Sequence, residues 1–132
     1  MNTPAKLTDN DALELAEQYR QASSALRKYR LGNSNKLSQP RQDELKQLEA
    51  SLRDAARDMT TTAAIIVINE SQTNLAELRA IHQEAIEVLD TINGIKKVID
   101  IVTALLGLAS AISTGKPKEV WGNVQALRGL LA

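Results

Sequence analysis

The sequence predicts an all-α fold: an elongated antiparallel bundle of four helices, one of them long and heptad-patterned, with coiled-coil-like packing. Two observations support this prediction. Between residues 81 and 109, apolar residues recur in alternating steps of four and three, which keeps one apolar seam facing a partner helix. The apolar residues are nearly all Ala, Leu, Ile and Val, with no Phe, one Trp and two Tyr, a set that suits helix–helix seams. The 132 residues are expected to form one helical-bundle domain (1–132) with a core of its own.

The longest seam predicts a single helix over residues 72–113. The seam keeps its phase across Asn93-Gly94, a pair that ordinarily ends a helix, so we expect the helix to continue through it for roughly 60 Å. The seam consists of Ile81, Ala85, Val88, Ile92, Ile95, Ile99, Val102, Leu106 and Ala109.

Three further helices complete the predicted bundle, near residues 9–31, 39–68 and 118–131. Gly32 ends the first helix, and Gly115 and Pro117 separate the long helix from the last one. The last helix can then fold back over the distal part of the long helix. The β-branched run at residues 65–68 lowers helix propensity, but the sequence offers no second strand, so we predict helix there.

The connection between the second helix and the long helix allows two interpretations. The seam changes phase after Ile66, and Asn69 followed by Gln72 resembles a capping box. This favours a reversal over residues 69–72, and hence an antiparallel hairpin. The alternative is one continuous helix over residues 39–113 with a stutter in its heptads.

The uncharged stretch from Ile101 to Thr114 is the most unusual part of the sequence. A helix that is apolar around its circumference is buried either in protein or in lipid. With fourteen residues the stretch is shorter than the roughly 20 that span a bilayer, so we favour a core segment covered by neighbouring helices. The alternative is a membrane-active tip, because a long helical hairpin with an uncharged head containing Gly and Ala resembles α-helical pore-forming toxins in architecture.

Composition and motifs argue against an enzyme, a cofactor or a metal site. The chain has no Cys, and its only histidine, His82, has Arg79 three residues before it, where di-iron bundles place an acid. We therefore expect His82 to lie partly exposed on a helix flank. Gly115-Lys116 lacks the earlier glycine and the following Ser or Thr of a phosphate-binding loop. No catalytic residue, cofactor, metal or small-molecule substrate is predicted.

Opposite charges are concentrated in two different segments, although the formal net charge is zero. Residues 20–41 contain six basic side chains and no acid, whereas residues 70–90 contain five acids and only Arg79 as a base. Basic residues next to tyrosines can bind nucleic acid. Tyr19 and Tyr29 occupy seam positions, however, so nucleic acid is not an expected partner. We expect the two segments to complement each other, within one chain or between subunits.

The predicted function is a non-enzymatic protein–protein interaction or structural module, such as an adaptor. It would bind a protein partner or form a homo-oligomer through apolar heptad seams. The alternative is a membrane-associated protein that uses residues 101–114. The polar residues 39–44 cannot cover the distal part of the long helix, so the predicted interaction surface comprises Ile99, Val102, Leu106, Ala109, Trp121 and Leu127. No signal peptide is visible, so we expect a cytoplasmic protein, with leaderless secretion as the open alternative.

Overall fold

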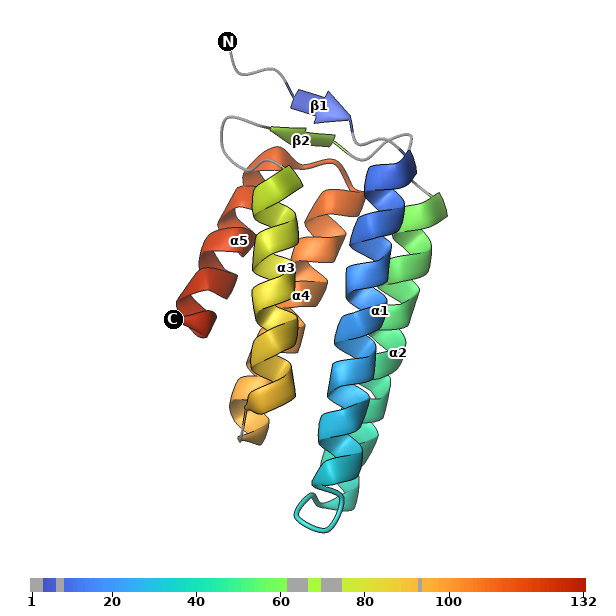
Figure 1. The fold of residues 1–132 in the computed structure, drawn as a ribbon, viewed down its shortest axis with the longest axis vertical. Coiled ribbons are helices and arrows are strands. Elements are labelled where there is room, and N and C mark those ends of the chain that lie inside the picture. Colours follow the sequence, from blue (N-terminus) through green and yellow to red (C-terminus); the bar gives the residue numbers. More distant parts are fainter. Residues whose placement is uncertain (1–3, 7–8, 62–66, 70–74, 93) are drawn as a thin grey trace.

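The structure is a computed structural model that describes residues 4–6, 9–61, 67–69, 75–92 and 94–132. These residues form five helices: α1 (Asp9–Gly32), α2 (Gln39–Thr61), α3 (Leu75–Thr91), α4 (Ile95–Ser113) and α5 (Pro117–Leu131). Two short strands, β1 (Pro4–Lys6) and β2 (Val67–Asn69), lie at one end of the helices (Figure 1). The predicted all-α class is confirmed, but the part of the chain that the structure describes forms five helices rather than the expected four.

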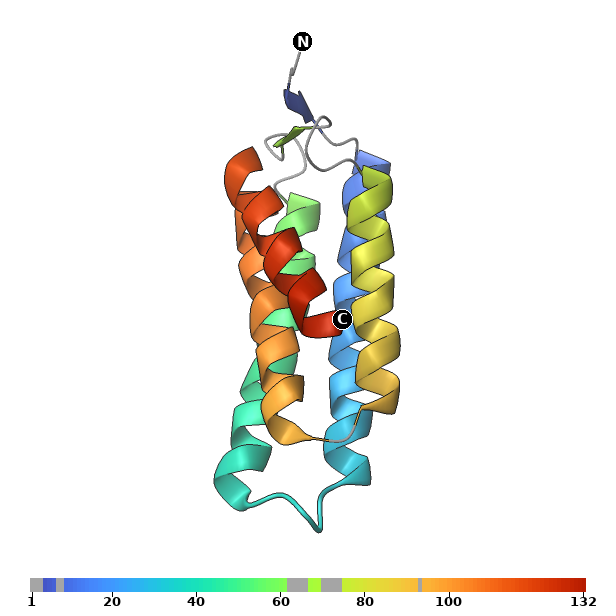
Figure 2. The same cartoon turned by 90° about the vertical axis from the view of Figure 1, so that its left-hand side faces the viewer.

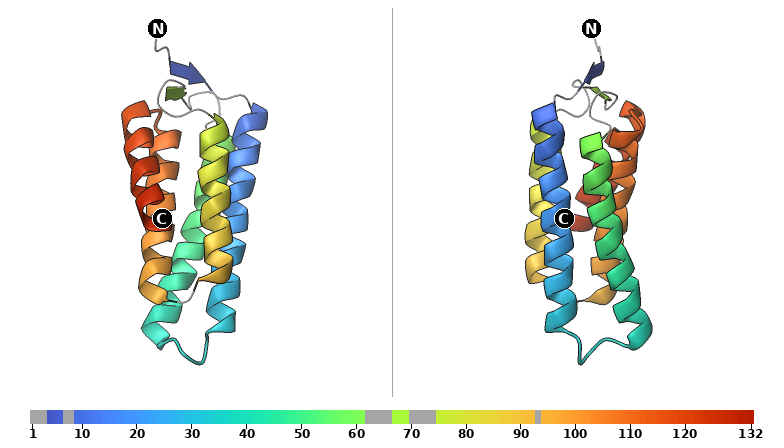
Figure 3. Two further views of the ribbon diagram at one scale, coloured as in Figure 1. Left: turned by 60° about the vertical axis from the view of Figure 1, so that its left-hand side comes forward. Right: turned by 90° about the vertical axis from the view of Figure 1, so that its right-hand side faces the viewer.

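The helices run side by side with alternating directions. α1, α3 and α5 run one way, whereas α2 and α4 run the other way (Figures 1 and 3). α1 contacts α2 and α3, and α4 contacts α2 and α5. Figure 2 shows that α5 crosses diagonally from α4 toward α3 and ends about halfway along the bundle. The last helix therefore folds back over α4, as the sequence predicts.

One apolar core runs between the helices, because each helix carries apolar residues every three or four positions along one face. Leu15, Tyr19 and Leu26 of α1 meet Leu45, Leu52 and Met59 of α2 in this core. The other helices contribute Leu78, Ile81, Ala85 and Leu89 from α3, Val98, Ile101, Leu105, Leu108 and Ile112 from α4, and Val120, Val124 and Leu127 from α5.

The prediction of one long helix over residues 72–113 is wrong. α3 ends at Thr91 and α4 begins at Ile95, and the two helices run in opposite directions (Figure 1). Gly94 has a φ of 140°, a backbone conformation that L-residues rarely adopt. The unbroken heptad phase does not distinguish a long helix from a hairpin. Both arms of a hairpin need an apolar face toward the same core, so the apolar spacing can stay in phase while the chain reverses. Asn93 lies outside the described residues.

The reversal also changes which face of α4 is buried. Ile101, Leu105, Leu108 and Ile112, which lie beside the predicted seam, are fully or almost fully buried. The seam residues Ile95, Ile99 and Leu106 are only partly buried. The core therefore receives the neighbouring stripe of α4 together with two residues of the predicted seam, Val102 and Ala109.

The substitution Gly94→Ala is expected to change stability in opposite directions in a continuous helix and in the observed turn. Inside a continuous helix, Gly94→Ala would stabilise the protein by roughly 0.5–1 kcal/mol. In the observed turn, alanine must adopt a φ near 140°, so we expect Gly94→Ala to destabilise the protein by about 1–3 kcal/mol in urea unfolding. Gly122→Ala is the matched control, because Gly122 lies within α5 and a Cβ there would meet no atom within 4 Å. We expect Gly122→Ala to stabilise the protein slightly, and a stabilising Gly94→Ala would contradict the turn.

Two sequence expectations between α2 and α3 also need correction. The second helix ends at Thr61 rather than at residue 68, and Val67–Asn69 is a strand that pairs antiparallel with Pro4–Lys6. The partner strand comes from the N-terminal segment, where nothing in the sequence indicated a strand. Residues 70–72 of the expected turn lie outside the described residues. Because α2 and α3 run in opposite directions, the single helix over residues 39–113 is excluded.

Candidate functional site

The six residues of the predicted interaction surface differ in burial. Val102, Ala109 and Leu127 are buried in the core of the chain itself. Ile99, Leu106 and Trp121 are partly exposed. Leu106 and Ala109 line one groove between α2 and α4, whereas Trp121 and Leu127 belong to α5, which does not line this groove.

The groove between α2 and α4 has a volume of about 360 Å³. The apolar part of its lining consists of Ala55, Leu106 and Ala109, none of which is fully exposed. Around them lie two acidic side chains and four hydroxyl groups, from Asp54, Asp58, Ser51, Ser110, Ser113 and Thr114. The groove thus combines an apolar centre with a polar rim, as protein–protein interfaces do.

The part of α2 that faces this region differs from the expectation. Residues 39–44 were expected to lie opposite the distal long helix and to leave it uncovered. Because the chain reverses before Ile95, the distal part of α4 lies instead beside residues 51–58 of α2. α5 covers another side, where Gly107 comes so close that a Cβ would lie 2.7 Å from Asn123 Oδ1. α4 therefore contacts α2 and α5 along its uncharged stretch.

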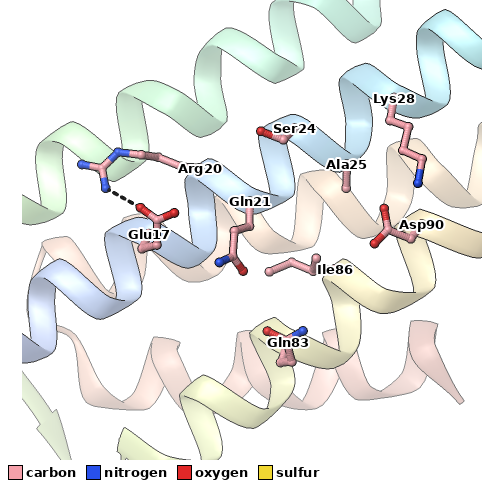
Figure 4. Close-up of a pocket in the computed structure, with 9 residues that line it drawn as sticks. All are labelled: Glu17, Arg20, Gln21, Ser24, Ala25, Lys28, Gln83, Ile86 and Asp90. Atoms are coloured by element: carbon pink, nitrogen blue, oxygen red, sulfur yellow. Dashed lines mark hydrogen bonds and ion pairs between the residues drawn. The ribbon is translucent and has the colours of Figure 1, made fainter.

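A second groove, of about 420 Å³, lies between α1 and α3 (Figure 4). Ala25 and Ile86 are buried at its base. Glu17 pairs with Arg20 at one end, and Lys28 and Asp90 extend toward each other at the other end (Figure 4). The structure thus places the basic and acidic segments side by side within one chain. The charges along this groove have partners of opposite sign nearby, which makes it the weaker candidate for a binding surface.

A polar cluster, buried at Tyr19 and His82 and partly exposed at Gln18, joins α1, α3 and α4. The Tyr19 hydroxyl donates to the Leu105 carbonyl at 2.8 Å and lies 2.9 Å from His82 Nε2. His82 Nδ1 lies 3.2 Å from Gln18 Oε1, and Gln18 Nε2 donates to the Arg79 carbonyl at 2.9 Å. Burial lowers the pKa of His82 to about 3 and raises the pKa of Tyr19 well above its usual value.

The expectation that His82 lies partly exposed on a flank is wrong, because only 1% of its surface is accessible. The signal was present in the sequence: Leu78, His82, Ala85 and Leu89 are spaced by four, three and four residues, so His82 belongs to a buried stripe. Tyr19 and His82 are the titratable pair that sequence reasoning missed. Neither side chain reaches solvent, so the cluster connects helices and does not present a proton donor or acceptor to a substrate.

Within the described residues, no three His, Asp or Glu side chains gather in a way that could hold a metal ion. None of the described helices combines the length and the apolar character needed to cross a membrane. Comparisons with protein-family models, curated protein sequences and solved structures find no match.

Proposed function

We propose that the protein is a non-enzymatic helical interaction module that self-associates through the groove between α2 and α4. The observation that carries the proposal is Leu106, an aliphatic side chain that stays partly exposed after all five helices have packed. It lies next to Ala55 and Ala109 in a groove surrounded by hydroxyl and carboxylate groups. An apolar side chain from a second copy would gain stabilisation by excluding water from this centre.

The shape of the groove suits a helix as the binding element. Ser110, Ser113 and Ala109 are small, so a helix from another copy can approach α4 closely at these positions. The hydroxyl groups and the carboxylates of Asp54 and Asp58 provide hydrogen-bonding groups around the contact. They would orient the incoming helix, whereas burial of Leu106 would supply most of the affinity.

The burial of Tyr19 and His82 supports the non-enzymatic part of the proposal. These two side chains have strongly shifted pKa values, which in an enzyme often mark the residues that exchange protons with a substrate. Here both lie inside the bundle, and their polar atoms bond to neighbouring helices. Their shifts follow from core burial, so they do not point to catalysis.

The test is Leu106→Glu, measured by sedimentation velocity of the purified protein in buffer without detergent. We expect the variant to sediment as a smaller species than the wild type and to bind its own copies at least tenfold more weakly, because a charge must then be desolvated in the contact. Thr103→Glu is the matched control: it adds the same charge to an exposed position of α4 outside the groove, and we expect the wild-type mass. Circular dichroism checks that both variants stay helical.

Two outcomes would contradict the proposal. If Leu106→Glu has the same mass as the wild type, the groove is not the contact surface. If the wild type co-floats with phosphatidylcholine–phosphatidylglycerol vesicles and Leu106→Glu does not, residues 101–114 act on lipid, and membrane association replaces self-association as the function.

A further inference from the structure

The polar cluster around His82 contains one proton too few when the imidazole is neutral. Three contacts need a proton each: Tyr19 hydroxyl to the Leu105 carbonyl at 2.8 Å, His82 Nε2 to the Tyr19 hydroxyl at 2.9 Å, and His82 Nδ1 to Gln18 Oε1 at 3.2 Å. Tyr19 has one hydroxyl proton, and a neutral imidazole has one N–H. Gln18 cannot reverse its amide to supply the third proton, because its Nε2 donates to the Arg79 carbonyl. One of the three contacts therefore lacks a proton.

A protonated imidazole would complete the contacts but would carry an uncompensated charge. Both partners of the ring nitrogens are neutral groups, a phenol and an amide. The helices packed against α3 are α1, α4 and α5. On α1, Asp11 and Glu14 pair with Arg79, and on α5, Arg128 pairs with Glu77. On α4, residues 101–114 carry no charge. A buried cation without a paired anion is strongly disfavoured.

We propose that His82 is an acid-sensitive latch: the neutral ring holds α1, α3 and α4 together, and its protonation releases them. The latch is independent of the groove between α2 and α4, because none of its residues lines that groove. The packing of α1, α3 and α4 against one another would then depend on pH through the binding of a single proton.

The direction of the pH effect follows from the two states of the chain. In the folded protein, burial lowers the pKa of His82 to about 3, whereas the unfolded chain has the ordinary histidine value of about 6.5. As the pH falls below about 6.5, the unfolded chain binds a proton that the folded chain does not. The neutral ring therefore makes its full contribution to the free energy of unfolding above pH 6.5. This contribution is lost as the pH falls toward 3, with the ratio of folded to unfolded protein falling up to tenfold for each pH unit.

The experiment combines urea unfolding with NMR titration of the imidazole. Because His82 is the only histidine, its ring carbon and nitrogen signals identify it without further assignment. When the pH falls from 7.5 to 4.5, we expect the ratio of folded to unfolded protein to fall about a hundredfold more for the wild type than for His82→Gln, because glutamine cannot titrate. We also expect the folded wild type to show no imidazole titration near pH 6.5.

Gln18→Glu is a second variant that keeps the test decisive if His82→Gln does not fold. A carboxylate at residue 18 would pair with the imidazolium and compensate its charge, so this variant should keep its stability when the pH falls from 7.5 to 5. The latch is overturned if the wild-type signal titrates near pH 6.5 while the bundle stays folded. It is also overturned if the wild type and either variant lose stability in parallel.

Discussion

Leu105→Ala is expected to destabilise the protein by about 3–4 kcal/mol, whereas Leu106→Ala costs less than about 1.5 kcal/mol. Leu105 is 1% exposed and packs in the core, so its truncation leaves a cavity in addition to the lost apolar burial. Leu106 is only partly buried, at the groove between α2 and α4. Urea unfolding of the two variants at pH 7.5 measures the difference.

These adjacent leucines distinguish the observed packing of α4 from the packing that the heptads predict. In the heptad seam Leu106 points into the core and Leu105 lies beside it, so the larger loss would fall on Leu106. If Leu106→Ala costs as much as Leu105→Ala, α4 does not present the observed face to the core. Both variants delete the same atoms, so differences in side-chain size do not affect the comparison.

Glu49→Ala is expected to destabilise the protein by about 3 kcal/mol, because it breaks the ion pair that joins α1 to α2. Arg30 Nε and a terminal Arg30 nitrogen bond to the two Glu49 oxygens at 2.6 and 3.1 Å. The two side chains are 12% and 4% exposed, and the hydrogen bond to Glu49 raises the pKa of Arg30. Without Glu49, the Arg30 guanidinium is left largely buried and unpaired.

Glu44→Ala is the matched control for Glu49→Ala. Glu44 also pairs with an arginine, Arg41, at 2.8 Å, but both side chains are more than 40% exposed. Exposed pairs contribute little because water screens the charges, so we expect a loss below about 0.5 kcal/mol. If Glu44→Ala and Glu49→Ala lower the free energy of unfolding equally, burial does not strengthen the ion pair between Arg30 and Glu49.

The sequence predicts the helix ends that depend on local chemistry. Gly32 and Pro117 mark the end of α1 and the start of α5, and both helices lie within a residue of their expected bounds. Such signals act over one turn of chain, so a single sequence contains them. The all-α class is predictable for a similar reason, since the apolar period of each segment is a local property.

The features that were predicted wrongly depend on contacts between distant residues. The strand at Val67–Asn69 needs the partner Pro4–Lys6, which lies more than sixty residues earlier in the chain. The reversal at Gly94 needs a positive φ, and the heptad pattern is compatible with this conformation but does not predict it. The spacing of α3 indicates that His82 is buried, but its hydrogen-bond partners, Tyr19 and Gln18, lie on another helix, so the sequence does not predict the contact.

The candidate site was predictable only in part. Leu106 and Ala109 were expected to share one surface, and both line the groove between α2 and α4. The α2 side chains of this groove, such as Ala55 and Asp58, were not foreseen. They depend on the direction of α4, and that direction follows from the reversal before Ile95.

The measurement that tests the central proposal most directly is the mass of the wild-type protein by sedimentation equilibrium, over a hundredfold range of concentration and without detergent. One chain has a mass of 14.4 kDa. Self-association predicts an average mass that rises with concentration toward a multiple of this value, and a lower mass for Leu106→Glu at each concentration. A wild-type mass of 14.4 kDa at every concentration would contradict the proposal that this bundle acts by binding its own copies.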